Sequence, residues 1–516
     1  MTTSCSSSSS SSSNNTTTSP PLPYVIQGFV QPGFEPVREA FEENFRVGRD
    51  SKAALVVYWK DKKVIDLWGV DGPERTNEAG RAYDSNALTV SFSTSKTITA
   101  ICLGMLVDKG FIRYEDRIVD HWPEFSQTVA EASQSASKDV EKETATVADL
   151  LRHDLGLTNP KQVFQTSDFR VENIRQNRVG QVFESEALTY PDANSRGDGA
   201  LREYHGMTYG LIVSELIRRV DPLKRTIGQF IHDELFVQLG LDIHCGSKDE
   251  QVRANTWDLE VPNPFKVIGM AWTPSFLYER ARQVPSILEL LKFSKNAMVG
   301  YTALMKKVDR LRLRDFQFFF GMLWRNRFCQ DEHGEGFPNV SLSLVNHQEF
   351  REVEFSSINV LASAQGLGKL AAFMANHGSL GSEQILRRST WNKMHGQTRI
   401  KSDIFFGGVR TEFSQGGMNH FRFYQDDEVL EEQFKMGRSG FWGWIGLGGS
   451  TFQWHPKHNI GFAFCPTKVA WYDLFNEKAG SLQEIIVECV RSLEAKSNRR
   501  ANKSSKKSAG SKRNLA

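Results

Sequence analysis

The chain has 516 residues, of which 40% are hydrophobic and 24% charged, the ordinary composition of a globular protein with a sizeable core. Its length allows one large domain or two modest ones. The formal net charge is +2, but residues 496–516 contain eight Lys or Arg and no acid, which leaves the rest near −6. This distribution argues against a nucleic-acid-binding folded body.

The cysteines and the first residues of the chain bear on its compartment. The six cysteines form no C-x-x-C pair and no cluster with histidine, so we expect reduced thiols and no disulfides. Residues 1–23 show no secretory signal, and the first arginine, Arg38, comes too late for a mitochondrial presequence. No uncharged stretch approaches the roughly 18–20 apolar residues of a membrane span. The sequence therefore predicts a cytoplasmic protein with no membrane span.

The N-terminal part of the chain divides into a tail and a hairpin. Residues 1–23 are rich in Ser, Thr and Asn and end in prolines, a composition that predicts disorder. Two β-branched, apolar runs follow, Ala53–Trp59 and Lys63–Gly69, separated by a short polar turn. They predict a β-hairpin.

The strongest local feature is the pair Ser93 and Lys96, three positions apart at the start of an apolar stretch. Apolar residues recur with helical period after Lys96 until Gly110, so both side chains lie on one face of a predicted helix. Burial and the positive end of the helix both disfavour the ammonium form of a lysine at this place. A neutral Lys96 can take the proton of Ser93 and make it a nucleophile.

The S-x-x-K spacing is not specific by itself. It also occurs at Ser135/Lys138 and at Ser504/Lys507, in polar surroundings with no apolar helix behind them. Taken alone, Ser93 and Lys96 fit an N-cap serine followed by an exposed lysine better than a catalytic pair. The interpretation as a catalytic pair therefore depends on the rest of the chain.

Residues 276–346 contain apolar residues at helical spacing and a dense aromatic patch. They predict a helical insertion in the main domain. Its aromatic residues belong either to the core of an inserted subdomain or to a lid over a hydrophobic substrate pocket.

The C-terminal part predicts a second hairpin, a helix and a tail. Ser450–Trp454 and Ile460–Cys465 flank a polar turn, and Leu482 to Leu493 carry apolar residues at spacings of three and four. Residues 496–516 are basic and Ser-rich, so we expect a second disordered tail. It is either a solvated tail or a basic patch that serves as a nuclear-localisation signal or binds an anionic surface.

Together these elements predict an α/β (α+β) domain over residues 24–495. Hairpins from both ends of the chain would share one antiparallel sheet, flanked by helices, and the middle would form a mostly helical second lobe.

Several segments resemble the serine β-lactamase and penicillin-binding-protein family, in particular its class C-like, esterase-like branch. Ser93-Thr-Ser-Lys96 resembles the family's S-x-x-K nucleophile element. The other matching segments, in family order, are Asp116–Phe125, Thr146–Thr158, Tyr204–Leu211, Gly228–Phe230 with Glu234–Leu241, and Gly443–Ser450. They span nearly the whole folded body, so their joint occurrence is specific although each is short.

The resemblance implies roles for further residues. Tyr204 is similar to the tyrosine that joins Lys96 in moving the proton of Ser93 to the leaving group. The implied oxyanion hole uses the backbone N–H groups of Ser93 and Leu447. Trp444 and Gly446, on the strand that carries the family's third element, would border the substrate.

Two positions depart from the family pattern. Gly206 stands where β-lactamases usually have an asparagine, so no amide is present there to bind a β-lactam side chain. Trp444 stands where a lysine or histidine is usual, and an indole only donates one hydrogen bond. The substrate is then a neutral ester or amide, or turnover is weak. His153 and His205 remain polar candidates nearby, and a structural role is expected for each.

Other classes fit less well. The chain contains no G-x-S-x-G motif and no H-E-x-x-H or H-x-H-x-D motif, so we expect no metal and no cofactor. The sequence therefore predicts a serine hydrolase that acts on a small-molecule ester or amide. The alternative is a catalytically weak or inactive descendant of the fold that serves as a scaffold or self-assembling structural protein. Homo-oligomer formation is left open.

Overall fold

The computed structural model describes most of the chain. The described residues are 24–72, 76–126, 142–158, 160–162, 164–188, 201–260, 329–330, 345–406, 408–427, 429–469 and 475–513. The disorder expected for residues 1–23 lies outside these ranges. So does nearly all of the insertion predicted at 276–346, of which only 329–330 and 345–346 are described.

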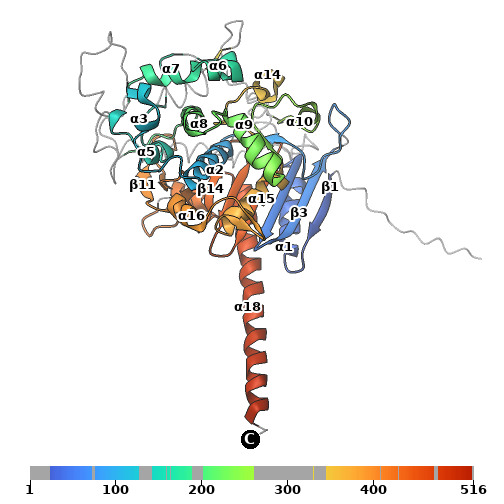
Figure 1. Ribbon diagram of the computed structural model, residues 1–516. Helices are drawn as coiled ribbons and strands as arrows, with labels where there is room; N and C mark the ends of the chain where they lie inside the picture. Colours follow the sequence, from blue (N-terminus) through green and yellow to red (C-terminus); the bar gives the residue numbers. More distant parts are fainter. Residues whose placement is uncertain are drawn as a thin grey trace, which may run out of the picture.

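A nine-stranded antiparallel sheet forms the centre of the fold (Figure 1). Its strand order is β1-β3-β2-β16-β15-β14-β13-β12-β11. The strands are β1 (Tyr24–Val30), β2 (Lys52–Trp59), β3 (Lys62–Asp71), β11 (Arg399–Ser402), β12 (Arg410–Phe413), β13 (Asn419–His420), β14 (Trp442–Ile445), β15 (Thr451–His455) and β16 (Ile460–Pro466). Both predicted hairpins are present, as β2–β3 and β15–β16. Because β2 also pairs with β16, the two ends of the chain share one sheet, as predicted.

The sheet is covered on both faces, which explains the continuous apolar run of β2. Alternate residues of a strand point to opposite faces, and Leu55 and Val56 accordingly belong to two different core clusters. On the face of Leu55 pack α1 (Glu35–Arg46) and α18 (Glu477–Arg513). On the face of Val56 packs α15 (Ala364–Ala375). The result is three layers, with helices on either side of the sheet.

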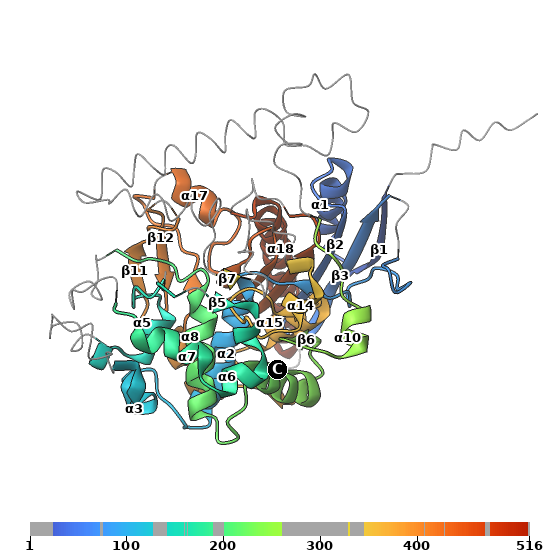
Figure 2. The same cartoon turned by 90° about the horizontal axis from the view of Figure 1, so that it is seen from above.

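The predicted helical lobe is formed by the middle of the chain. Its helices are α3 (Ile118–His121), α5 (Val147–Leu151), α6 (Val171–Arg175), α7 (Arg178–Ser185), α8 (Thr208–Val220), α9 (Ile227–Ile231), α10 (Glu250–Ala254) and α14 (Gln348–Arg351). Figure 2 shows α6, α7 and α8 grouped around α2 (Thr94–Asp108), apart from α1. Helix α2 is buried from Thr94 to Leu106, as expected of a helix that is apolar on all sides. It connects the lobe, through α8, with strand β14 of the sheet.

Shorter elements complete the described part of the chain. They are the helices α16 (Arg388–His395) and α17 (Val429–Lys435), the 3-10 turns Pro123–Ser126 and Thr166–Phe169, the π-helical turn His232–Val237, and the short strands β4 (Thr89–Val90), β5 (Phe164–Gln165), β6 (Ile243–His244), β7 (Cys329–Gln330), β8 (Leu361–Ala362), β9 (Ser379–Leu380) and β10 (Glu383–Gln384).

Helix α18 corrects one expectation. The helix predicted over Leu482 to Leu493 is present, but it continues to Arg513, and Figure 1 shows its C-terminal part projecting from the body. The structure thus describes residues up to Arg513 as helix, where the sequence predicts a disordered tail from residue 496. Burial of Leu482 and Val490 stabilises the first turns, and propagation through Lys, Arg and Ala then costs little. No helix in the described ranges has the length and apolar composition needed to cross a membrane.

Candidate active site

Ser93 is the N-cap residue of α2. Its hydroxyl makes no capping hydrogen bond with the helix, so it is available to other groups. The preceding residue, Phe92, has a φ of 48°, in the left-handed region that side chains rarely adopt. This tight turn connects β4 to α2 and leaves Ser93 half-buried at the start of the helix.

Lys96 lies one turn further along α2 and is 3% exposed. Its Nζ donates hydrogen bonds to Ser93 Oγ at 3.1 Å and to the backbone carbonyl of Ser357 at 2.8 Å. Desolvation by burial lowers the pKa of Lys96 well below its usual value of 10.5. A lysine with a lowered pKa more readily occurs as the neutral amine, which can accept a proton from Ser93.

Tyr204 lies shortly before α8 and is almost fully buried. Its phenol oxygen accepts a hydrogen bond from Nε1 of Trp444 at 2.7 Å, and Lys96 Nζ lies 5.1 Å from its ring centre. Burial raises the pKa of Tyr204 above its usual value, although hydrogen bonds with Ser93 and Trp444 oppose the rise. The phenol therefore keeps its proton at neutral pH while it contacts the Ser93 hydroxyl.

The backbone of Tyr204 is held by Asp403, which follows β11. One carboxylate oxygen, Oδ1, accepts hydrogen bonds from the N–H of Tyr204 at 3.2 Å and of Phe405 at 3.0 Å. A parallel bridge also joins Asp403 to Arg202. Burial raises the pKa of Asp403 to about 7. The segment that carries Tyr204 is thus fixed to the connection between β11 and β12.

Strand β14 ends against the turn that precedes α2. A Cβ atom on Gly446 would lie 2.6 Å from the backbone oxygen of Ser91, so only glycine allows this close approach. The Ser450 hydroxyl donates a hydrogen bond to the same oxygen at 2.6 Å. Trp444 is buried on β14, whereas Leu447 is 36% exposed just beyond its end. The end of β14 therefore packs closely against the turn at the start of α2.

The backbone N–H groups of Ser93 and Leu447 lie at this junction. In the described part of the chain, neither Ser93 nor Leu447 donates its N–H to another backbone group. Paired N–H donors of this kind suit an oxygen that gains negative charge during a reaction.

His153 and His205 have structural contacts, in keeping with expectation. Nδ1 of His153 accepts a hydrogen bond from the backbone N–H of His205 at 3.1 Å, and Nε2 of His205 accepts one from that of Leu157 at 3.2 Å. Burial lowers the pKa of both rings, that of His205 to about 3. Both imidazoles are therefore neutral and hold the segment before α8.

The structure brings the predicted site residues together at the start of α2. These residues are Ser93, Lys96, Tyr204, Trp444, Gly446 and Leu447. The indole of Trp444, predicted to border the substrate, is buried and directs its N–H to Tyr204. Sequence reasoning missed Ser357 and Asp403. Ser357 acts through its backbone carbonyl, and Asp403 lies about 200 positions from Tyr204 with no motif around it.

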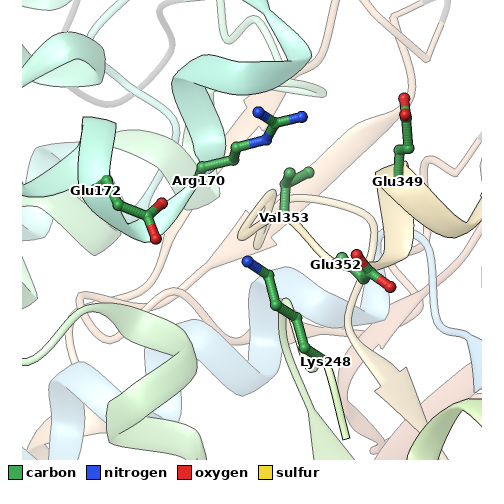
Figure 3. A pocket seen from close by; sticks show the side chains of 6 residues that line it. All are labelled: Arg170, Glu172, Lys248, Glu349, Glu352 and Val353. Carbon is green, nitrogen blue, oxygen red and sulfur yellow. The ribbon is translucent and has the colours of Figure 1, made fainter. Parts of the chain in front are cut away.

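Other parts of the described structure offer no competing centre. No group of three or more His, Cys, Asp or Glu side chains in the described ranges is arranged to hold a metal ion. A cavity of about 310 Å³ lies between α6 and α14 (Figure 3), and Ser93 is not among the residues that line it. Charges of both signs line it, from Arg170, Glu172, Lys248, Glu349 and Glu352, with Val353.

An antiparallel sheet built from both chain ends, with a helical lobe and a Ser-x-x-Lys pair between them, defines the β-lactamase and transpeptidase class of proteins. The family model described as Beta-lactamase matches residues 41–484. The chain therefore belongs to the beta-lactamase family.

Known relatives include esterases. The chain is 21% identical over 464 residues to the esterase/beta-lactamase LipL of Mycobacterium tuberculosis, covering 88% of this chain and 85% of that protein. A penicillin-binding protein homolog from Caulobacter crescentus has a TM-score of 0.61 at 20% identity, over 90% of this chain and 100% of its own. A family VIII carboxylesterase has a TM-score of 0.59 at 19% identity, over 89% and 100% respectively. These structural likenesses bear on the fold alone.

Proposed function

We propose that the chain is a serine hydrolase that cleaves a carboxylic ester or amide through an acyl-enzyme at Ser93. The observation that carries this proposal is a connected set of polar contacts at one point of the fold. Lys96 bonds to Ser93 Oγ at 3.1 Å, and Trp444 bonds to the phenol of Tyr204 at 2.7 Å, which itself contacts Ser93. The similarity to the esterase/beta-lactamase LipL supports the same class of reaction.

Acylation begins with attack of Ser93 Oγ on the substrate carbonyl, while neutral Lys96 accepts the hydroxyl proton. The carbonyl oxygen becomes an oxyanion and accepts hydrogen bonds from the N–H groups of Ser93 and Leu447. The tetrahedral intermediate collapses when the bond to the leaving group breaks. Tyr204 donates its proton to that leaving group and recovers a proton from the Lys96 ammonium.

Deacylation reverses the roles of the same groups. Water attacks the ester carbon of the acyl-enzyme and loses its proton to the Tyr204–Lys96 pair. The second tetrahedral intermediate releases the carboxylic acid and returns the proton to Ser93 Oγ. The cycle consumes one water molecule and leaves the side chains in their starting protonation states.

The described residues next to Ser93 bear on the charge of the substrate. The indole of Trp444 is uncharged, and its single N–H is donated to Tyr204. Trp444 therefore offers a substrate carboxylate neither a positive charge nor a hydrogen bond. Lys96 bonds to Ser93 and to a backbone carbonyl, and its pKa is lowered. A substrate without a negative charge is therefore the better fit.

A fluorophosphonate probe tests the proposal directly. The probe is expected to form a covalent adduct on the peptide that contains Ser93, as located by mass spectrometry, because phosphonylation requires an activated serine. Purified protein is also expected to hydrolyse p-nitrophenyl acetate.

Two variants make the labelling experiment decisive. Ser93→Ala is expected to lose the adduct, whereas Ser504→Ala, which has the same S-x-x-K spacing, is expected to keep it. A well-folded wild-type protein that neither labels nor hydrolyses any ester would favour the inactive scaffold over the enzyme.

A further inference from the structure

The turn that carries Leu447 is closed by its own backbone and joined to the start of α18. The N–H of Gly446 donates to the carbonyl of Ser450 at 2.7 Å, and the N–H of Gly449 donates to the carbonyl of Gly446 at 3.2 Å. The side-chain amide of Asn476, directly before α18, donates hydrogen bonds to the same two carbonyls, at 3.0 Å to Gly446 and at 3.3 Å to Ser450. Asn476 therefore bridges the two ends of the turn.

We propose that Asn476 is a positioning residue that directs the N–H of Leu447 toward the oxyanion formed at Ser93. This inference rests on the proposed hydrolase function and on the role proposed there for Leu447. The carbonyl of Gly446 and the N–H of Leu447 belong to one planar peptide group, and in a trans peptide the two point in opposite directions. A donor that fixes the carbonyl therefore also fixes the direction of the N–H. The same hydrogen bond polarises the peptide group, which makes its N–H a stronger donor.

The contacts of Asn476 are those of a residue that acts on the turn and not on the substrate. A side-chain amide nitrogen has two hydrogens, and two backbone carbonyls accept hydrogen bonds from that of Asn476. The residue is 1% exposed. Its φ of 53° lies in the left-handed region, which asparagine adopts more readily than most residues. Both the amide and the backbone conformation therefore suit asparagine at this position.

Buried polar contacts hold Asn476 in place beside the turn. The guanidinium of Arg438, which is fully buried, donates a hydrogen bond to the backbone carbonyl of Asn476. Lys478, in the first turn of α18, forms a buried ion pair with Asp50. A Cβ atom on Gly449 would lie 2.8 Å from Cε of Lys478, so the first turn of α18 packs directly against the turn. These contacts give the amide of Asn476 a fixed place.

The variant Asn476→Gly tests the inference, because glycine adopts the left-handed backbone readily and lacks the amide. With p-nitrophenyl acetate, kcat is expected to fall by roughly 10–10²-fold, less than the roughly 10²–10³-fold loss of a whole oxyanion donor, while KM stays near the wild-type value. Inhibition by phenylboronic acid, which bonds to the serine oxygen and becomes a tetrahedral anion, is expected to weaken by a similar factor. A role in stability alone would change neither value in the folded protein. Asn476→Asp keeps the shape of the side chain and has at most one proton to donate, so it should lose part of both and covers the case in which Asn476→Gly does not fold.

A matched control and the labelling experiment separate the possible failures. Asn459, in the turn between β15 and β16, also has a left-handed φ, of 52°, and its amide also donates to a backbone carbonyl, that of Ala375 at 3.3 Å. Asn459→Gly should keep the wild-type kcat and inhibition, and an equal loss in this variant would overturn the inference. An Asn476→Gly protein that labels at Ser93 but has an unchanged kcat, or a lowered kcat with unchanged inhibition by phenylboronic acid, also overturns it and leaves the hydrolase intact. Wild-type protein that fails to label at Ser93 rejects the hydrolase itself.

Discussion

Replacing Lys96 with alanine is expected to lower kcat for ester hydrolysis by roughly 10²–10⁴-fold, the usual contribution of a general base. Lys96 Nζ donates a hydrogen bond to Ser93 Oγ at 3.1 Å, and burial lowers the pKa of Lys96, which favours the neutral amine that can act as a base. The alanine variant keeps the serine and the backbone N–H donors, so residual turnover above background is expected. Steady-state kinetics with p-nitrophenyl acetate measure the loss, and a variant with near-normal kcat would contradict the role.

A Lys96→Arg variant separates the base from the positive charge. A guanidinium stays protonated at all accessible pH values, so it supplies charge but cannot accept a proton. We expect Lys96→Arg to be as impaired as Lys96→Ala, and a nearly active arginine variant would show that charge alone is needed.

The pH dependence of kcat is a second test of Lys96 as the base. Because the neutral amine is the active form, wild-type kcat should rise with pH through the lowered pKa of Lys96, well below the usual 10.5.

Much of the fold could be predicted from local sequence patterns. The two hairpins and the start of α18 were predicted because alternation in strands and spacings of three and four in helices reflect which side chains are buried. The extension of α18 to Arg513 could not be predicted, because residues 496–513 show no apolar residues at spacings of three and four that would indicate a helix.

Only the site residues whose side chains occur in motifs could be predicted from the sequence. Ser93 and Lys96 stand one helical turn apart, and Tyr204 follows in family order, so their meeting at one point could be predicted. The hydrogen bond from Trp444 to Tyr204 could not be predicted, because it joins positions 240 residues apart. The same holds for Asp403, whose effect on Tyr204 arises from the way the β11–β12 connection folds back.

A buried cluster of ions anchors the two segments that meet at Tyr204. Asp154 has a side chain with no exposed surface, and its carboxylate contacts Lys401 at 3.0 Å, Arg202 at 3.3 Å and Arg399 at 3.4 Å. Arg202 lies two residues before Tyr204, and Lys401 two residues before Asp403. One carboxylate therefore compensates the charges of both segments that hold the proposed proton donor.

Replacing Asp154 with alanine is expected to lower the free energy of unfolding by about 3–5 kcal/mol, the usual cost of removing one partner from a buried ion pair. The Arg202 and Lys401 side chains are also fully buried, so both charges would lose the carboxylate that they contact while they stay inside the protein. The midpoint of urea unfolding at neutral pH measures the change. Glu43→Ala, which removes an exposed pair with Arg46, is the matched control and should leave the midpoint in place. If Asp154→Ala unfolded at the wild-type midpoint, as Glu43→Ala should, the buried charges would not depend on the Asp154 carboxylate. The proposed anchoring of the Tyr204 segment by Asp154 would then be wrong.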